Sequence, residues 1–103
     1  MACELKIALS ATQDLKKIVQ YMVQELHAPE AANHFLQQVD LCYDHIRAFP
    51  TMYESCEMAA SQQAGLRKAL IGNYVLIYQV DEEKSCATVL RFFYGRRDFY
   101  KDI

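Results

Sequence analysis

The fold is decided by Leu66-Arg-Lys-Ala-Leu-Ile-Gly-Asn-Tyr-Val-Leu-Ile-Tyr-Gln-Val80, which reads as two strands joined by a tight turn. Both arms are rich in β-branched, aliphatic and aromatic residues, as strands are. Gly72-Asn73 between them predicts a two-residue hairpin turn, because glycine adopts a positive φ without strain. With that turn the strands cover 66–71 and 74–80, and Ile71 pairs with Tyr74.

A third strand is predicted downstream, at residues 87–94, after a short acidic turn at 81–85. Period-two alternation gives this strand two sides, which carry Val89, Arg91 and Phe93 on one and Leu90, Phe92 and Tyr94 on the other. Both sides of the sheet mix polar and apolar residues. The alternation therefore does not tell which side faces the rest of the protein.

Upstream, residues 3–9 alternate as a half-buried strand, and a helical pattern of apolar residues follows to about residue 26. Ser10 and Gln13 have the spacing of a capping box at the start of that helix. Pro29 suits the first turn of a second helix, which runs to about residue 48. Residues 51–64 show no periodicity, which predicts a loop.

The predicted order of elements is β-α-α-β-β-β. It indicates an α+β fold in which an N-terminal helical hairpin packs on one face of a small, mainly antiparallel sheet. A chain of 103 residues has the size of one domain, so we expect residues 1–103 to form a single domain. Hydrophobic residues make up 52% of the chain, which argues against disorder.

Composition also bears on location and on cofactors. No signal peptide or membrane span is evident, so we expect a cytoplasmic protein with no membrane partner. The four cysteines are far apart and form no CxxC pair, which predicts reduced thiols and no metal site. We expect no cofactor. Residues 1–65 carry four Lys and Arg against eight acids, whereas residues 66–103 carry seven against five, so the C-terminal part suits an anionic partner.

The last strand ends in a basic and aromatic segment, Gly95-Arg-Arg-Asp-Phe-Tyr100. Arg96 and Arg97 offer planar cations for bidentate contact with phosphate or carboxylate groups, and the aromatic rings suit stacking on bases. A purely structural role is equally open. In that case Asp98 pairs with Arg91 or Arg96, and the aromatic rings belong to the core.

Across nearly its whole length the sequence resembles the RelE/ParE superfamily of bacterial toxins from toxin–antitoxin modules. The resemblance lies in a series of motifs in the right order: Ser10-Ala-Thr-Gln-Asp-Leu, Tyr21, Pro29 to Phe35, Phe49-Pro50, Leu66-Arg-Lys, Gly72 to Tyr78, and Leu90-Arg-Phe-Phe-Tyr-Gly-Arg-Arg-Asp98. It implies the superfamily fold, growth inhibition, a role in plasmid stabilisation, and a small cognate antitoxin as partner.

Two activities are known in the superfamily, and the resemblance bears on both. RelE-like members cut ribosome-bound mRNA without metal, and Lys68 and Arg97 match basic positions of that set. Val75 stands where the archetypal ribonuclease has an arginine, and Ile103 where it has a tyrosine, so Tyr94 and Tyr100 are the remaining candidates for proton transfer. A tyrosine or lysine has an ordinary pKa near ~10 and needs a cationic pocket to act as a base.

The length of the helical hairpin favours the ParE-like branch, whose members inhibit DNA gyrase without a hydrolytic site. In that case Arg67, Arg91, Arg96 and Arg97 are the candidates for binding the target or the antitoxin. Two alternatives stay open. One is a metal-independent mRNA endonuclease that uses Lys68, Arg97, Tyr94 and Tyr100, and the other is an inactive toxin-like module that still binds its antitoxin.

Overall fold

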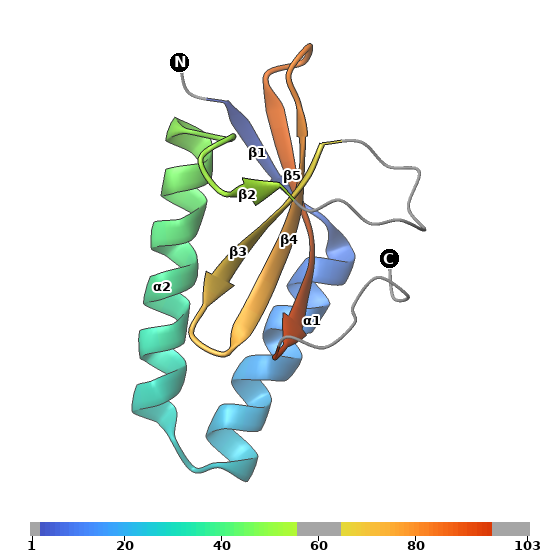
Figure 1. The fold of residues 1–103 in the computed structure, drawn as a ribbon. Coiled ribbons are helices and arrows are strands. Elements are labelled where there is room, and N and C mark those ends of the chain that lie inside the picture. The colour runs from blue at the N-terminus through green and yellow to red at the C-terminus, as the bar shows by residue number, and fades with distance from the viewer. Residues whose placement is uncertain (1–2, 56–64, 96–103) are drawn as a thin grey trace.

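The computed structural model describes residues 3–55 and 65–95. Strand β1 (Glu4–Ile7) leads into helix α1 (Leu9–Gln20), a π-helical segment η1 (Tyr21–Glu25) and helix α2 (Pro29–Ala48). Strands β2 (Glu54–Ser55), β3 (Leu66–Ile71), β4 (Tyr74–Asp81) and β5 (Cys86–Tyr94) follow (Figure 1). The predicted β-α-α-β-β-β order is confirmed, with β2 as an addition.

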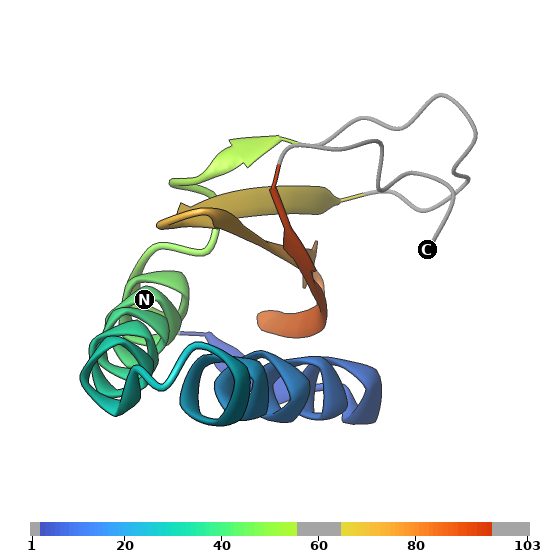
Figure 2. The same cartoon turned by 90° about the horizontal axis from the view of Figure 1, so that it is seen from below.

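The five strands form one sheet in the order β1-β5-β4-β3-β2. Only the β1–β5 pair is parallel, so the sheet is mainly antiparallel, as predicted. The two helices run antiparallel to each other and lie on the same side of the sheet (Figures 1 and 2). The chain therefore has two layers, with the second face of the sheet turned away from the helices.

The turn between β3 and β4 has the predicted form. Ile71 pairs with Tyr74, and the register continues without a break to Leu66 and Gln79. Gly72 adopts a φ of 59°, as the first central residue of a type II′ turn requires. The two-residue turn was sufficient to predict this register.

Strand β5 departs from the predicted alternation. The register with β4 shifts between Ile77 and Tyr78, because Ile77 pairs with Arg91 whereas Tyr78 pairs with Val89. Leu90 is thus an extra residue, a β-bulge. As a result Val89 and Phe92 both pack in the helix-covered core, and the prediction that they lie on opposite sides was wrong.

The capping box predicted at Ser10 was also wrong. Helix α1 begins at Leu9, and its N-cap residue Ala8 makes no side-chain cap. The Ser10 hydroxyl instead donates a hydrogen bond to the Leu90 carbonyl, at the bulge. The helical region does extend to the predicted end, although its last turn is the π-helical segment η1.

Residues 51–64 were predicted as a loop, yet Glu54 and Ser55 form β2 and pair with Lys68 and Arg67 of β3. A two-residue strand is too short to show periodicity in the sequence. Long-range bonds hold this segment in place: Arg67 donates to the Tyr53 carbonyl at 2.7 Å, and the Tyr78 hydroxyl donates to the Pro50 carbonyl at 2.8 Å.

The main hydrophobic core lies between the helices and the sheet. Among its fully buried members are Ile46 and Val39 of α2, and Leu76 and Tyr78 of β4. A smaller cluster lies on the other face of the sheet and contains Leu66, Val75, Ile77 and Phe93. No helix in the described ranges has the length and apolar character needed to cross a lipid bilayer.

Candidate functional site

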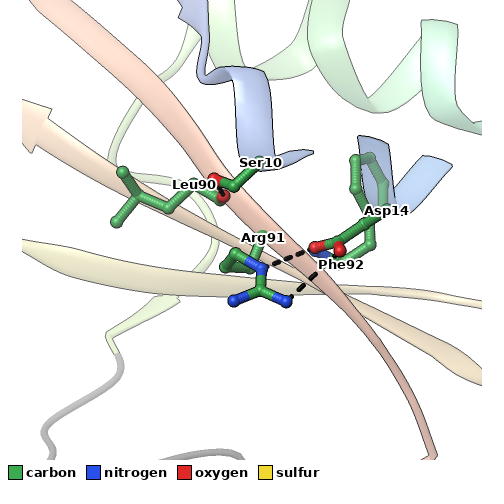
Figure 3. A network of polar contacts seen from close by, with 5 residues as sticks. All are labelled: Ser10, Asp14, Leu90, Arg91 and Phe92. Atoms are coloured by element: carbon green, nitrogen blue, oxygen red, sulfur yellow. Dashed lines mark hydrogen bonds and ion pairs between the residues drawn. The ribbon is translucent and has the colours of Figure 1, made fainter. Parts of the chain in front are cut away.

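The most extensive polar contact described in the protein joins α1 to β5. The Asp14 carboxylate accepts hydrogen bonds from Arg91 Nε at 2.6 Å and Arg91 Nη2 at 3.2 Å, and from the Phe92 backbone N–H at 3.1 Å (Figure 3). The Asp14 side chain is 15% exposed and the Arg91 side chain 33% exposed. A two-pronged ion pair this sheltered is stronger than an ordinary surface pair.

The same contact holds the β-bulge. Ser10 and Asp14 are four residues apart and thus lie on one face of α1. Ser10 binds the carbonyl of the bulged residue Leu90, and Asp14 binds the N–H of Phe92 two residues later (Figure 3). A bulge interrupts the regular pairing of a ladder. Here, the first turns of α1 provide partners for two of the backbone groups beside it.

Beyond the bulge, the register places Arg91 in line with Ile77, whose side chain lies on the sheet face turned away from the helices, while the Arg91 guanidinium reaches Asp14 on α1. The carbon of that guanidinium is 5.3 Å from the centre of the Phe93 ring. Ile77 separates Arg91 from Lys68, because Lys68 pairs with Ile77 and Ile77 pairs with Arg91. Lys68 Nζ in turn lies 3.8 Å from Glu54 Oε2. The two cations therefore share one cross-strand row.

The other predicted residues lie elsewhere. Arg67 precedes Lys68 and points to the helix side of the sheet, where it donates a hydrogen bond to the Tyr53 carbonyl. Tyr94 pairs with Tyr74, a member of the helix-side core, and their ring centres are 5.2 Å apart. Tyr94 and Lys68 are thus on opposite faces of the sheet. Arg96, Arg97 and Tyr100, and the predicted pairing of Asp98, lie outside the described residues.

Tyr94 is 60% exposed and stands where three hollows meet. The first, about 400 Å³, extends toward Asp14 and Arg91, and the second, about 360 Å³, toward Leu70. The third and largest, about 620 Å³, runs along α1 and η1. Tyr74 lines the second and third of these hollows. Burial raises the pKa of its hydroxyl, and the nearby hydroxyls of Tyr94 and Tyr21 raise that pKa further.

The described tyrosines with shifted pKa values are all shifted upward. Burial raises the pKa of Tyr43 and of Tyr78 to about 12, and it also raises the pKa of Tyr53. A phenol that acts as a base near neutral pH needs a shift in the other direction. These three tyrosines and Tyr74 are therefore unsuited to act as bases near neutral pH.

Sequence reasoning did not single out Asp14. Its signal was the Ser10-Ala-Thr-Gln-Asp14 spacing, which places a hydroxyl and a carboxylate on one helix face. The ion-pair partner of Arg91 in the structure is Asp14, which the sequence analysis did not name, and the predicted pairing of Asp98 stays a prediction. Among the described residues, no group of three or more His, Cys, Asp and Glu side chains is placed to hold a metal ion.

A comparison with protein-family models matched residues 5–99 to the ParE toxin of the type II toxin–antitoxin system parDE. The chain belongs to this ParE toxin family. The resemblance inferred from the motifs is therefore confirmed, with the ParE branch favoured. A search of curated protein sequences found no match.

Solved structures of toxins share the fold of this ParE-family chain. The chromosomal ParDE system of P. aeruginosa matches with a TM-score of 0.70 at 18% identity, covering 92% of this chain and 98% of that one. The RelBE2 toxin–antitoxin complex of Mycobacterium tuberculosis matches at 0.65 and 19%, covering 95% of each chain. The isolated E. coli RelE toxin matches at 0.64 and 16%, covering 98% and 93%.

Proposed function

We propose that this ParE-family toxin inhibits bacterial growth by acting on DNA gyrase, and that a cognate antitoxin neutralises it. The observation that carries the proposal is the position of two of the residues that the sequence offered for RNA cleavage. Lys68 and Tyr94 lie on opposite faces of the sheet, whereas cleavage of RNA needs its acid, base and cations around one phosphate. Membership of the ParE family supports the same conclusion.

We assign the contact with the target to Arg96 and Arg97, which follow the end of β5. Arg91 and Arg67 are engaged within the described fold, by Asp14 and by the Tyr53 carbonyl respectively. We call the hydrogen bonds of Asp14 with Arg91 and Phe92 the clasp. In this proposal the clasp fixes the end of β5, after which the basic segment follows in the sequence. Bidentate contact with carboxylate or phosphate groups is the chemistry that such arginines offer.

One observation favours mRNA cleavage as a second candidate. Lys68 and Arg91 belong to neighbouring positions of one cross-strand row, so a phosphate there would meet two cations if it displaced their carboxylate partners Glu54 and Asp14. If the protein cleaves mRNA, Arg97 and Tyr100 are the other residues that take part in the reaction. Tyr94 takes no part, because it is on the other face.

The test is a pair of assays with the purified chain. We expect it to block supercoiling of relaxed plasmid by gyrase, and to leave ribosome-bound message intact as read by primer extension. Cleavage of the message at codon positions would overturn the gyrase assignment. A chain that affects neither process and does not slow growth would point to the inactive, antitoxin-binding module.

The role of Arg97 is tested by Arg97→Ala, with Lys16→Ala as the control because it removes one charge from an exposed position of α1. We expect Arg97→Ala to restore growth and Lys16→Ala to remain toxic. Full toxicity in a stably folded Arg97→Ala variant would contradict the assignment.

A further inference from the structure

The hollow of about 620 Å³ along α1 and η1 has two walls of different chemistry. Ile18, Met22 and Leu26 line the helical wall at four-residue intervals, so their aliphatic side chains form one stripe. Tyr74 and Tyr94 line the wall formed by the sheet, and their ring centres are 5.2 Å apart. A ligand in this hollow therefore contacts aliphatic groups on one side and aromatic rings on the other.

The polar side chains around the hollow are few, and they offer mainly hydrogen-bond donors. They are the Tyr21, Tyr74 and Tyr94 hydroxyls, the Asn73 amide and the Lys17 ammonium. Burial, and the nearby hydroxyls of Tyr94 and Tyr21, raise the pKa of Tyr74, so its hydroxyl keeps its proton at neutral pH. Such a set suits a ligand that accepts hydrogen bonds.

The charge at the hollow is positive. Lys17 is the only charged residue among the described residues that line it. The adjoining hollow of about 400 Å³ also reaches Lys17 and contains the Asp14 carboxylate, but Arg91 engages that carboxylate. The net effect on a ligand beside Lys17 is therefore attraction of an anion.

The size and the exposure of the hollow fit a small molecule. Sites of this kind have volumes of roughly 300 to 1,000 Å³, mainly apolar walls and a few converging polar groups. Leu26 is 54% exposed, Tyr21 52% and Tyr94 60%, so a ligand can reach them without opening the core. Met22 at the helical wall is buried, which gives the hollow a closed floor.

We propose that this hollow binds a small planar aromatic anion, such as an aromatic carboxylate, with its ring between the aliphatic stripe and Tyr94 and its charge at Lys17. A flat ring packs on a tyrosine face and also contacts the thioether of Met22. The site goes beyond the toxin function and does not rest on it. Because Tyr94 is the last residue of β5, the ligand also stabilises the end of that strand.

Other ligand classes match the two walls less well. Aromatic rings attract organic cations, but Lys17 repels them. A saturated acid pairs with Lys17 and lacks the stacking on Tyr94. A single-stranded nucleic acid needs several cations along its backbone, and the described lining supplies one.

Three probes that differ in one property each test the proposal on the purified chain. Naphthoate is aromatic and anionic, naphthalenemethanol is aromatic and neutral, and decahydronaphthoate is anionic with a saturated ring. Each is titrated into isotope-labelled protein, and amide chemical shifts give its dissociation constant. We expect naphthoate to bind at about 1 mM or tighter, and the other two about threefold or more weakly.

Absence of saturable naphthoate binding would overturn the proposal. Equal affinity of naphthalenemethanol would overturn the requirement for an anion, and equal affinity of decahydronaphthoate the requirement for an aromatic ring. The amides whose shifts change with naphthoate should lie at 17–26, at 73–74 and at Tyr94. Changes confined to other regions would contradict the assignment of the site.

Two matched pairs of variants at exposed positions test the contacts. Lys17→Gln removes the charge at the hollow, and Lys16→Gln removes one from an exposed lysine outside its lining. We expect Lys17→Gln to weaken naphthoate binding about threefold to fivefold and to leave naphthalenemethanol within about twofold, because an exposed ammonium acts through its charge. Lys16→Gln should change neither. Equal losses for the two probes, or equal effects of the two variants, would overturn the role of Lys17.

Leu26→Ala shortens the aliphatic stripe, and Leu41→Ala is its control on α2, where the leucine is 50% exposed. We expect Leu26→Ala to weaken both aromatic probes about threefold or more, and Leu41→Ala to leave them within about twofold. Thermal unfolding confirms that each variant is folded. Equal affinities of the two leucine variants would place the ring outside the hollow and contradict the proposal.

Discussion

Strand β4 has two neighbours, and the two pairings are built in different ways. Its pairing with β3 runs without interruption from the Gly72 turn to Gln79. Its pairing with β5 shifts register at Ile77 and Tyr78, and leaves Leu90 as an extra residue. The first pairing depends on residues next to each other in the chain, whereas the second depends on Asp14, which is 77 residues from Arg91.

The difference shows what each kind of register requires. A two-residue turn determines its own pairing, because its backbone conformation allows one alignment of the flanking strands. A bulge interrupts the ladder of hydrogen bonds, so its polar groups need other partners in order to avoid a desolvation cost. In this protein α1 provides them, and the end of β5 depends on that helix.

The largest effect is expected for Asp14→Ala, which removes all three hydrogen bonds of the clasp. We expect a loss of about 3 kcal/mol in the free energy of unfolding, because the Arg91 guanidinium and the Phe92 N–H both lose their hydrogen bonds to Asp14. Urea unfolding measures this. Asp14→Asn should lose less, since its amide oxygen still accepts one bond.

Asp44→Ala is the control for that experiment. Asp44 pairs with Arg47 one turn away on α2, and both side chains are largely exposed. Exposed pairs of this type contribute about 0.5 kcal/mol or less. An Asp14→Ala variant as stable as Asp44→Ala would show that the bulge does not need the clasp.

The next effect is a pH dependence at Tyr78, the β4 residue at the register shift. Burial raises its pKa to about 12 from the usual 10. As pH rises between these values, the unfolded chain loses the proton while the folded chain keeps it, so stability falls. We expect Tyr78 to account for about 2 kcal/mol of that loss.

Tyr78→Phe measures the contribution by difference, since other buried tyrosines also titrate at high pH. The variant also loses the hydrogen bond to the Pro50 carbonyl, which lowers its stability at neutral pH. Its unfolding free energy should then vary less than that of the wild type above pH 10. Parallel curves for the two proteins would contradict the assignment.

A smaller effect is expected at the turn of the regular pairing. Gly72→Ala places a side chain at a φ of 59°, although nothing lies within 4 Å of the added Cβ. The cost is backbone strain alone, about 1 kcal/mol. Gly72→Asn should recover part of it, because asparagine tolerates this conformation. Equal melting temperatures for wild type and Gly72→Ala would contradict the backbone strain assigned to this position.

The smallest effect is expected for Ser10→Ala, which removes the bond to the Leu90 carbonyl. Because Ser10 is exposed, water replaces its hydroxyl, and the loss should be about 0.5 kcal/mol. Faster hydrogen exchange in β5 near residue 90 would be the more sensitive readout. A loss as large as that of Asp14→Ala would instead make Ser10 the main support of the bulge.

Much of the fold was predictable because it depends on local signals. The Gly72-Asn73 turn, the Pro29 start of α2 and the β-α-α-β-β-β order are all written in short stretches of sequence. The capping role predicted for Ser10 and the alternation predicted for β5 were wrong for one reason. Each prediction considered one element alone. In the structure the Ser10 hydroxyl of α1 bonds to the Leu90 carbonyl of β5, at the bulge that interrupts the alternation.

The candidate site was predicted in part. The motifs indicated the family, whereas the role of the basic segment after β5 stays a prediction. Lys68 and Tyr94 could not be assigned to faces from mixed alternation, and Asp14 could not be linked to Arg91 across 77 positions. The hollow along α1 and η1 also had no sequence signal, since its lining combines the helical region with Tyr74 and Tyr94, which lie far away in the sequence.

By itself, the sequence determined the order of elements, the register of the β3–β4 hairpin and the family, because periodicity, turns and motifs are properties of neighbouring residues. Only the tertiary structure decided which face of the sheet the helices cover, where β5 bulges and which cation Asp14 engages. Those outcomes depend on packing between segments far apart in the chain, where a buried polar group must find its partner in space.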